Sequence, residues 1–192
     1  MKIILASKSK RRKKLLEKLN LKFTVVDSCF DESTIFVNHS NPEDYCLKQA
    51  YEKANLVSER YPSDIIIGSD TIVYHDKMIL GKPKNKKDAI KQLKSLSNNE
   101  HFVFTSVNII NKKLNINESF TDKTMVKFYK LKDEEILFYI DKYKPFDKAG
   151  SYGIQNWSSI FVEKINGCYY NVVGFPLPKF YKLLHKLFPG IN

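Results

Sequence analysis

Cysteines are few in this sequence, and they lie far apart. Cys29, Cys46 and Cys168 are odd in number and form no C-x-x-C pair, and the four histidines are equally scattered. A disulfide framework or a zinc site needs such residues at short, regular spacings. The sequence therefore predicts neither a disulfide-stabilised domain nor a zinc-binding module.

Long apolar runs are also lacking. No stretch approaches the roughly 20 apolar residues of a membrane-spanning helix. The first apolar stretch ends at Ala6, which is too short for the core of a signal peptide. We therefore expect a soluble, cytoplasmic protein with no membrane partner.

Hydrophobic residues nevertheless make up 43% of the 192 residues, and aromatic residues make up 13%. This composition is typical of a folded chain with a buried core and argues against disorder. The length fits one domain with two lobes over residues 1–192.

Arginine is scarce although the net charge is +11: only Arg11, Arg12 and Arg60 are arginines among 32 basic residues. A basic chain attracts polyanions, so a nucleic-acid-binding or division-regulating protein is one hypothesis. The lysines are spread along the whole chain without a recognisable motif. We therefore favour a chain with no specific nucleic-acid partner.

Two of the three arginines are adjacent in the stretch LASKSKRRKKLL, where six of the seven positions from Lys8 to Lys14 are basic. A helix that begins at Ser7 or Ser9 would direct free N–H groups toward an anion. Arginine can hold a phosphate with two parallel hydrogen bonds. Charge alone favours a solvated basic helix slightly, so the phosphate-site hypothesis needs support from the rest of the chain.

Apolar spacing predicts interleaved strands and helices. Strands are expected at residues 2–5, 22–27, 64–74, 78–83, 101–110 and 119–129, with a hairpin of 159–165 and 169–174. Helices are expected from about residue 9 to 19, then at 41–60, 86–96, 131–143 and 177–188. Some neighbouring strands suit antiparallel pairing. The pattern predicts an α/β fold with a mixed, twisted sheet and flanking helices.

Asp70 interrupts the apolar segment DIIIGSDTIVY, at an apparent Gly-Ser-Asp break. A carboxylate there is costly to bury unless it is paired or lines a cleft, so Asp70 is either a turn residue or a general base or metal ligand. Together with Asp31 and Glu32 it could hold Mg²⁺. Lys53 and Lys82 would add cations. This set suits a nucleoside triphosphate, although no P-loop or dinucleotide-binding glycine motif is present.

Several blocks occur in an order that resembles the Maf family of nucleoside triphosphate pyrophosphatases. They are LASKSKRR, FDES, KQAYEKA, IIIGSDTIV, ILGKP, HFVFTSV, DKAGSYGIQ and NVVGFPL. The resemblance covers essentially the whole chain. One departure is Lys10, which stands where the family's opening block has proline. Because proline would pre-set the first helical turn, this loop is expected to be less rigid.

The resemblance implies a fold similar to that of inosine triphosphate pyrophosphatases, with two lobes around a deep cleft, in a homodimer. It implies hydrolysis of a nucleoside triphosphate to the monophosphate and pyrophosphate with Mg²⁺ or Mn²⁺. Asp70 would accept the proton from water, and Glu32 with Asp70 would bind the metal. The residues implied in substrate binding are Ser7, Ser9, Arg11, Arg12, Lys53, Thr71, Lys82 and Gln155.

Within that set, Arg11, Thr71 and Gln155 match positions that the resemblance links to base choice in the branch acting on dTTP and UTP. An amide such as that of Gln155 can pair with a pyrimidine edge through one donor and one acceptor. The substrate could also be a modified pyrimidine nucleotide, in a house-cleaning role. The alternatives within the same chemistry are 7-methyl-GTP and ITP.

Overall fold

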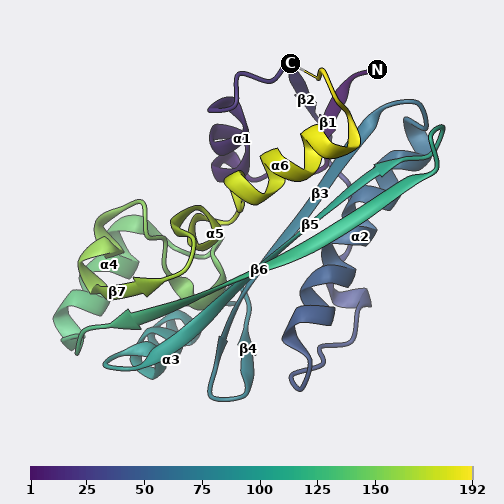
Figure 1. The fold of residues 1–192 in the computed structure, drawn as a ribbon. Coiled ribbons are helices and arrows are strands. Elements are labelled where there is room, and N and C mark those ends of the chain that lie inside the picture. The colour runs from purple at the N-terminus through teal and green to yellow at the C-terminus, as the bar shows by residue number, and fades with distance from the viewer. Residues whose placement is uncertain (192) are drawn as a thin grey trace.

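The computed structural model describes residues 1–191, in which seven strands form one mixed sheet. The strand order is β2-β1-β3-β5-β6-β7, and β4 pairs with β3 (Figure 1). β1 runs parallel to β2 and β3, and the remaining pairs are antiparallel. This confirms the predicted mixed sheet. The strands are β1 (Ile3–Leu5), β2 (Phe23–Val25), β3 (Ile65–His75), β4 (Met78–Leu80), β5 (Glu100–Asn111), β6 (Ile116–Phe128) and β7 (Val162–Asn166).

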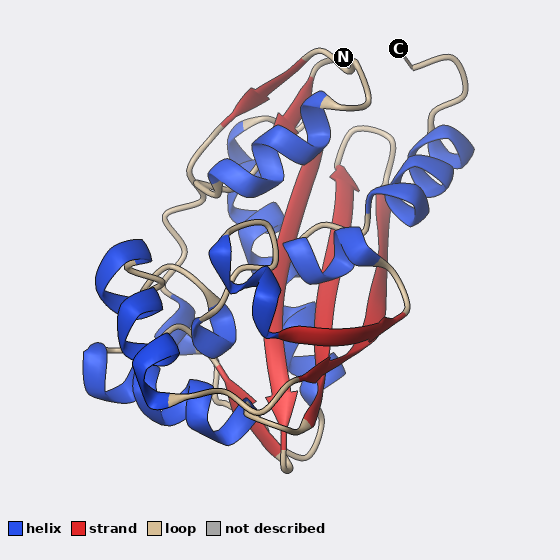
Figure 2. Cartoon of the chain, turned by 90° about the vertical axis from the view of Figure 1, so that its left-hand side faces the viewer, coloured by secondary structure: helices blue, strands red, loops and turns tan. Residues whose placement is uncertain are grey.

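Helices flank the sheet and close its ends (Figures 1 and 2). They are α1 (Lys10–Glu17), α2 (Pro42–Arg60), α3 (Lys86–Leu96), α4 (Asp133–Tyr143), α5 (Tyr169–Val173) and α6 (Leu177–Leu187), with short 3₁₀ helices at Glu32–Thr34, Ala149–Ser151 and Trp157–Phe161. Within residues 1–191, no helix is both long and apolar enough to cross a membrane.

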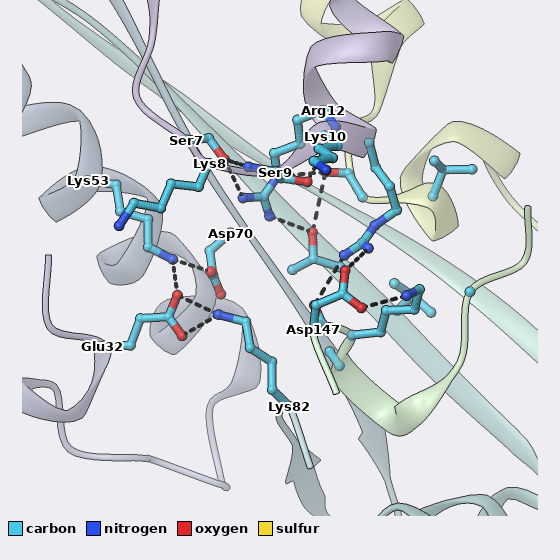
Figure 3. A pocket seen from close by; sticks show the side chains of 18 of the residues that line it. Ser7, Lys8, Ser9, Lys10, Arg12, Glu32, Lys53, Asp70, Lys82 and Asp147 are labelled. Atoms are coloured by element: carbon cyan, nitrogen blue, oxygen red, sulfur yellow. Dashed lines mark hydrogen bonds and ion pairs between the residues drawn. The ribbon is translucent and has the colours of Figure 1, made fainter. Parts of the chain in front are cut away.

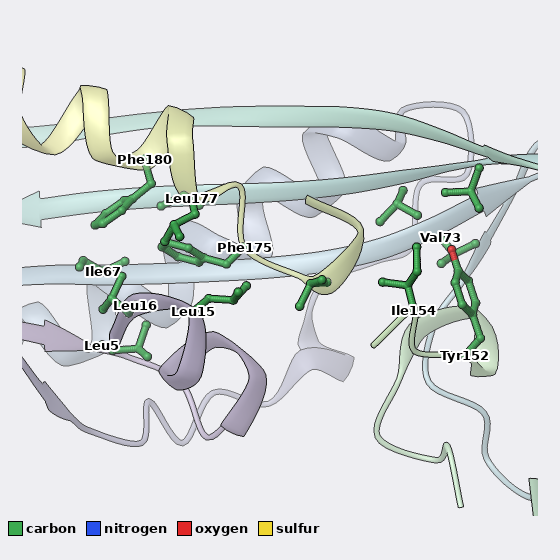
Figure 4. Close-up of a cluster of buried hydrophobic side chains, with 14 of the residues drawn as sticks. Leu5, Leu15, Leu16, Ile67, Val73, Tyr152, Ile154, Phe175, Leu177 and Phe180 are labelled. Atoms are coloured by element: carbon green, nitrogen blue, oxygen red, sulfur yellow. The ribbon is translucent and has the colours of Figure 1, made fainter. Parts of the chain in front are cut away.

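Alternating side chains of the central strands divide the core between the two faces of the sheet. Leu5 and Ile67 pack with Leu15 and Leu16 of α1 and with residues of α6 (Figure 4). Their neighbours in sequence point the other way, and Ile66 packs against α2. This is the period of two that β-strands impose on buried segments. It places α1 and α2 on opposite faces, with the start of α1 and the middle of α2 close to the middle of β3.

The apparent break at Gly68-Ser69-Asp70 is not a break, because β3 continues through it to His75. Gly68 faces α2 so closely that an added Cβ would lie 2.2 Å from the Ala50 carbonyl oxygen and 2.7 Å from the Ala54 nitrogen. The glycine therefore serves close packing of helix on strand rather than a turn. That close approach brings the side chains of α2 next to Asp70.

We predict that Gly68→Ala destabilises the protein by about 2 kcal/mol, because the extra methyl group overpacks a rigid helix–strand contact. Urea unfolding followed by circular dichroism measures the change. Gly81→Ala is the matched control, since a Cβ there meets no atom within 4 Å. Equal stability of the two variants would contradict the packing role of Gly68.

The hairpin predicted from 159–165 and 169–174 is wrong in its second half. β7 pairs with β6, and Tyr169–Val173 forms helix α5. The Asn171 side chain donates hydrogen bonds to the Val103 carbonyl oxygen and to Thr124 Oγ1. These contacts fix the segment as a helical turn on the sheet, so tertiary structure outweighs the strand propensity of its tyrosines and valines.

Candidate active site

Hydrogen bonds of two serines, Ser7 and Ser9, fix the loop that precedes α1. Ser9 is the N-cap: its Oγ accepts a hydrogen bond from the Arg12 backbone nitrogen at 3.4 Å, and its own nitrogen donates to Ser7 Oγ at 3.2 Å. Of the two expected capping residues, Ser9 is the one that caps. Lys10 begins the helix with an exposed side chain. The positive end of α1 thereby borders the cleft described below.

Three segments that are distant in sequence fix the guanidinium group of Arg12. Its Nε donates to the Gly174 carbonyl oxygen at 3.1 Å, Nη1 to Ser7 Oγ at 3.3 Å, and Nη2 to Thr71 Oγ1 at 3.1 Å. All three acceptors are uncharged, so the positive charge of Arg12 is oriented without being neutralised by a direct ion pair. Gly174 ends α5 with φ of 115°, a conformation that favours glycine.

A network of four charged side chains lies beside Arg12 (Figure 3). Lys53 Nζ, from α2, lies 2.6 Å from Asp70 Oδ1 and 2.8 Å from Glu32 Oε1. Lys82 Nζ, from the loop after β4, contacts both carboxylate oxygens of Glu32, at 3.0 and 2.9 Å. The Lys53 side chain is only 8% exposed and that of Asp70 13%. One buried lysine thus holds two carboxylates from different elements.

Electrostatics keeps Glu32 and Lys53 of this network charged. Partial burial opposes the ionisation of Glu32, but Lys53 and Lys82 outweigh it and lower the pKa of Glu32 to about 2. Burial also disfavours the charged form of Lys53, but Asp70 and Glu32 outweigh this effect and raise the pKa of Lys53. Near neutral pH, Lys53 is therefore a cation and Glu32 an anion.

These groups line one cleft with a volume of about 730 Å³, within the range of small-molecule sites. The site residues that the family resemblance implies all lie on its wall, although they come from widely separated segments. They are Ser7, Ser9, Arg11, Arg12, Glu32, Lys53, Asp70, Thr71, Lys82 and Gln155. The structure therefore brings these ten residues together around a single cleft. Asp31, which the sequence also offered as a metal ligand, does not line the cleft and instead caps the 3₁₀ helix Glu32–Thr34.

Two residues of the cleft wall, Asp147 and Lys148, were not among the predicted site residues. Asp147 accepts a hydrogen bond from Arg11 Nη1 at 2.6 Å, and Lys148 lies beside it on the cleft wall. Both belong to the block DKAGSYGIQ, which was a signal that these positions matter. The side chain of Asn171 fixes α5 on the sheet, and the carbonyl oxygen of Gly174 at the end of α5 accepts the hydrogen bond from Arg12. The local sequence around Asn171 does not indicate this role.

The carboxylates suit a divalent cation that is shared with a substrate. Within residues 1–191, no three histidine, cysteine or acidic side chains gather into a metal site built by protein alone. Glu32 and Asp70 nevertheless contact the same nitrogen of Lys53, so their oxygens lie no farther apart than the sum of those two contacts. Mg²⁺ is often held by one or two carboxylates plus substrate phosphates. The donor set therefore fits such an ion.

Comparison with solved structures supports the fold. The structure of a HAM1 protein from Coxiella burnetii matches with a TM-score of 0.51 at 12% identity. The match covers 97% of this chain and 99% of that one. At this identity the likeness shows the mixed α/β fold alone, which agrees with the class predicted from the sequence.

Sequence relatives are much closer. A dTTP/UTP pyrophosphatase from Thermosipho melanesiensis is 48% identical over 184 residues, covering 96% of this chain and 97% of the relative. Another dTTP/UTP pyrophosphatase, from Carboxydothermus hydrogenoformans, is 42% identical over 186 residues, covering 97% and 98%. The family model described as Maf-like protein matches residues 2–187. With this match over nearly its whole length, the chain belongs to the Maf family.

Proposed function

We propose that the protein is a nucleoside triphosphate pyrophosphatase that hydrolyses dTTP and UTP to the monophosphate and pyrophosphate. The names of its relatives support this substrate pair. The observation that carries the proposal is the pairing of Lys53 with both Asp70 and Glu32 on the wall of a cleft that Arg12 also lines. Cations for phosphate groups and a carboxylate for water are the groups that hydrolysis of a phosphoanhydride requires.

The triphosphate fits the cationic part of the cleft. Arg12 presents a charge held only by neutral acceptors, and Ser7 and Ser9 lie at the positive end of α1. Phosphate oxygens bind favourably at such a helix start. Lys82 is half-exposed and approaches from the opposite side of the network, through a loop that follows β4. In this arrangement Ser7, Ser9, Arg12 and Lys82 bind phosphate, while Lys53 stays with the carboxylates.

Asp70 accepts the proton from the attacking water. Its Oδ1 is fixed by Lys53, and no hydrogen bond from the described residues reaches its Oδ2. Water attacks the α-phosphorus, the bond from that phosphorus to the bridging oxygen breaks, and pyrophosphate leaves. Arg12 and Lys82 stabilise the negative charge that grows on the phosphate oxygens during this step.

Glu32 and Asp70 would hold Mg²⁺ or Mn²⁺ together with the phosphates. When bound, such an ion supplies positive charge at the phosphate oxygens and lowers the barrier to attack. Lys53 then serves as the fixed partner that keeps the two carboxylates close to each other despite their like charge. Adding EDTA to the protein is expected to suppress turnover, and adding Mg²⁺ back is expected to restore it.

The nucleoside fits the part of the cleft away from the Lys53 network, where Val73, Ile154 and Val173 contribute apolar side chains to the wall. Thr71 and Gln155 supply polar groups there, and an amide can match the donor and acceptor of a pyrimidine edge. These residues, with Arg11, select dTTP and UTP. A purine such as 7-methyl-GTP or ITP presents a larger, differently patterned edge to the same groups.

A panel of nucleotides tests the proposal. With Mg²⁺, purified protein is expected to release pyrophosphate from dTTP and UTP with kcat/KM at least about tenfold above that for CTP, GTP, 7-methyl-GTP and ITP. Preference for 7-methyl-GTP or ITP would leave the reaction class intact and refute the base choice. Absence of turnover on every nucleotide would refute the proposed activity.

A further inference from the structure

We propose that Asp147 is a positioning residue for nucleoside selection, which fixes Arg11 and Lys148 at the end of the cleft away from the Lys53 network. Figure 3 shows the separation: Glu32, Lys53 and Asp70 lie on one side of the cleft, and Asp147 lies on the other. The inference rests on the proposed function and extends it, because it separates the roles of the two adjacent arginines.

Asp147 uses three oxygens to hold two cations. Its Oδ2 accepts from Arg11 Nη1 at 2.6 Å, and its carbonyl oxygen accepts from Arg11 Nη2 at 3.3 Å. Its Oδ1 contacts Lys148 Nζ at 2.5 Å. Arg11 belongs to α1, and Lys148 to the segment that leads to Gln155. One carboxylate therefore links two walls of the cleft that are 136 residues apart in sequence.

The side chain of Lys148 packs on the segment just before Gln155. A Cβ added to Gly153 would lie 2.9 Å from both Cδ and Cε of Lys148, so the lysine stem lies directly on the backbone of Gly153. The Lys148 side chain is 14% exposed, which shows that the stem is packed rather than solvated. Through Lys148, Asp147 thus restrains the backbone two residues before Gln155.

The two arginines differ in what their charge can do. Arg12 donates to three neutral oxygens and keeps its charge available for phosphate. Arg11 is already paired with a carboxylate, so it offers a phosphate much less net charge. Instead, Asp147 holds the guanidinium group of Arg11 in a fixed orientation on the cleft wall. That is the property needed to read the edge of a base rather than to neutralise a triphosphate.

A purely structural role does not account for this arrangement. The Asp147 side chain is 62% exposed, and exposed ion pairs contribute little to stability. Replacing it should therefore leave the fold intact, while Arg11 and Lys148 lose their common anchor. The effect should fall on nucleotide binding and selection, and not on the step at Asp70.

The test compares Asp147→Asn with Asp141→Asn. Asp141 is a matched control because it also pairs with a lysine, Lys86, at 2.6 Å and lies outside the cleft wall. Asp147→Asn is expected to raise KM for dTTP about tenfold, keep kcat within about twofold, and reduce the preference for dTTP over CTP about tenfold. Asp147→Glu should recover part of that preference. Asp141→Asn should match the wild type, and melting temperatures should agree within about 3 °C.

Binding of the α,β-methylene analogue of dTTP, measured by calorimetry, separates this inference from the proposed function. About tenfold weaker binding to Asp147→Asn than to wild type supports the positioning role, whether or not dTTP is turned over. Equal binding, or an unchanged preference for dTTP over CTP in a folded Asp147→Asn variant, overturns it. A wild type that binds the analogue but hydrolyses no nucleotide would refute the activity alone.

Discussion

Asp70→Asn is expected to lower kcat for dTTP by roughly 10²- to 10⁴-fold, the range that a positioned general base contributes. The amide keeps the size of the carboxylate and can still accept a hydrogen bond from Lys53, but it cannot take a proton from water. Stopped assays of pyrophosphate release measure the loss. Because Glu32 remains as a partner for Lys53, the variant should stay folded.

Asp76→Asn is the matched control for this prediction. Asp76 is an exposed residue in the turn after β3, at φ of 46°, a conformation that asparagine tolerates. It should retain wild-type activity. If Asp70→Asn kept more than a tenth of the wild-type kcat, Asp70 could not be the proton acceptor.

Lys53→Met is expected to destabilise the protein by about 3 kcal/mol and to lower kcat at least tenfold. Removing one member of a buried ion pair leaves an uncompensated charge, which is the costly part of such a change. Here the largely buried Asp70 loses its direct cation, whereas Glu32 keeps Lys82. Methionine preserves most of the volume of the lysine stem, so the loss of stability results from the missing charge rather than from poorer packing.

A double-mutant cycle isolates that charge effect. Adding Asp70→Asn to Lys53→Met removes the unpaired carboxylate, so the double variant should recover at least about 1 kcal/mol relative to Lys53→Met. Urea unfolding of the wild type, both single variants and the double variant provides the four values. Strict additivity of the two changes would show that Lys53 and Asp70 are not energetically coupled.

Local sequence signals predicted most of the elements. Asn41 and Pro42 marked the start of α2, where the Asn41 side chain caps the helix, and β-branched residues marked β3 and β5. α5 and the continuity of β3 were missed because distant contacts decide them. Asn171 reaches β5 and β6, and Gly68 is set by its packing on α2.

The candidate site likewise contains residues that the local sequence indicates and contacts that it does not. Unusual residue types, such as a paired arginine in a lysine-rich chain or an aspartate in an apolar strand, could be recognised locally. The link from Arg11 to Asp147 could not, because no local spacing relates residues 136 positions apart. The expected homodimer and cytoplasmic location stay predictions.

The position of water attack tests the central claim most directly. Hydrolysis of dTTP in water enriched in oxygen-18, followed by mass spectrometry of both products, shows which phosphorus receives the new oxygen. Attack at the α-phosphorus predicts the label in dTMP and unlabelled pyrophosphate. Label in pyrophosphate, or release of inorganic phosphate and dTDP instead, would contradict the assignment of Asp70 and its cationic neighbours to that reaction.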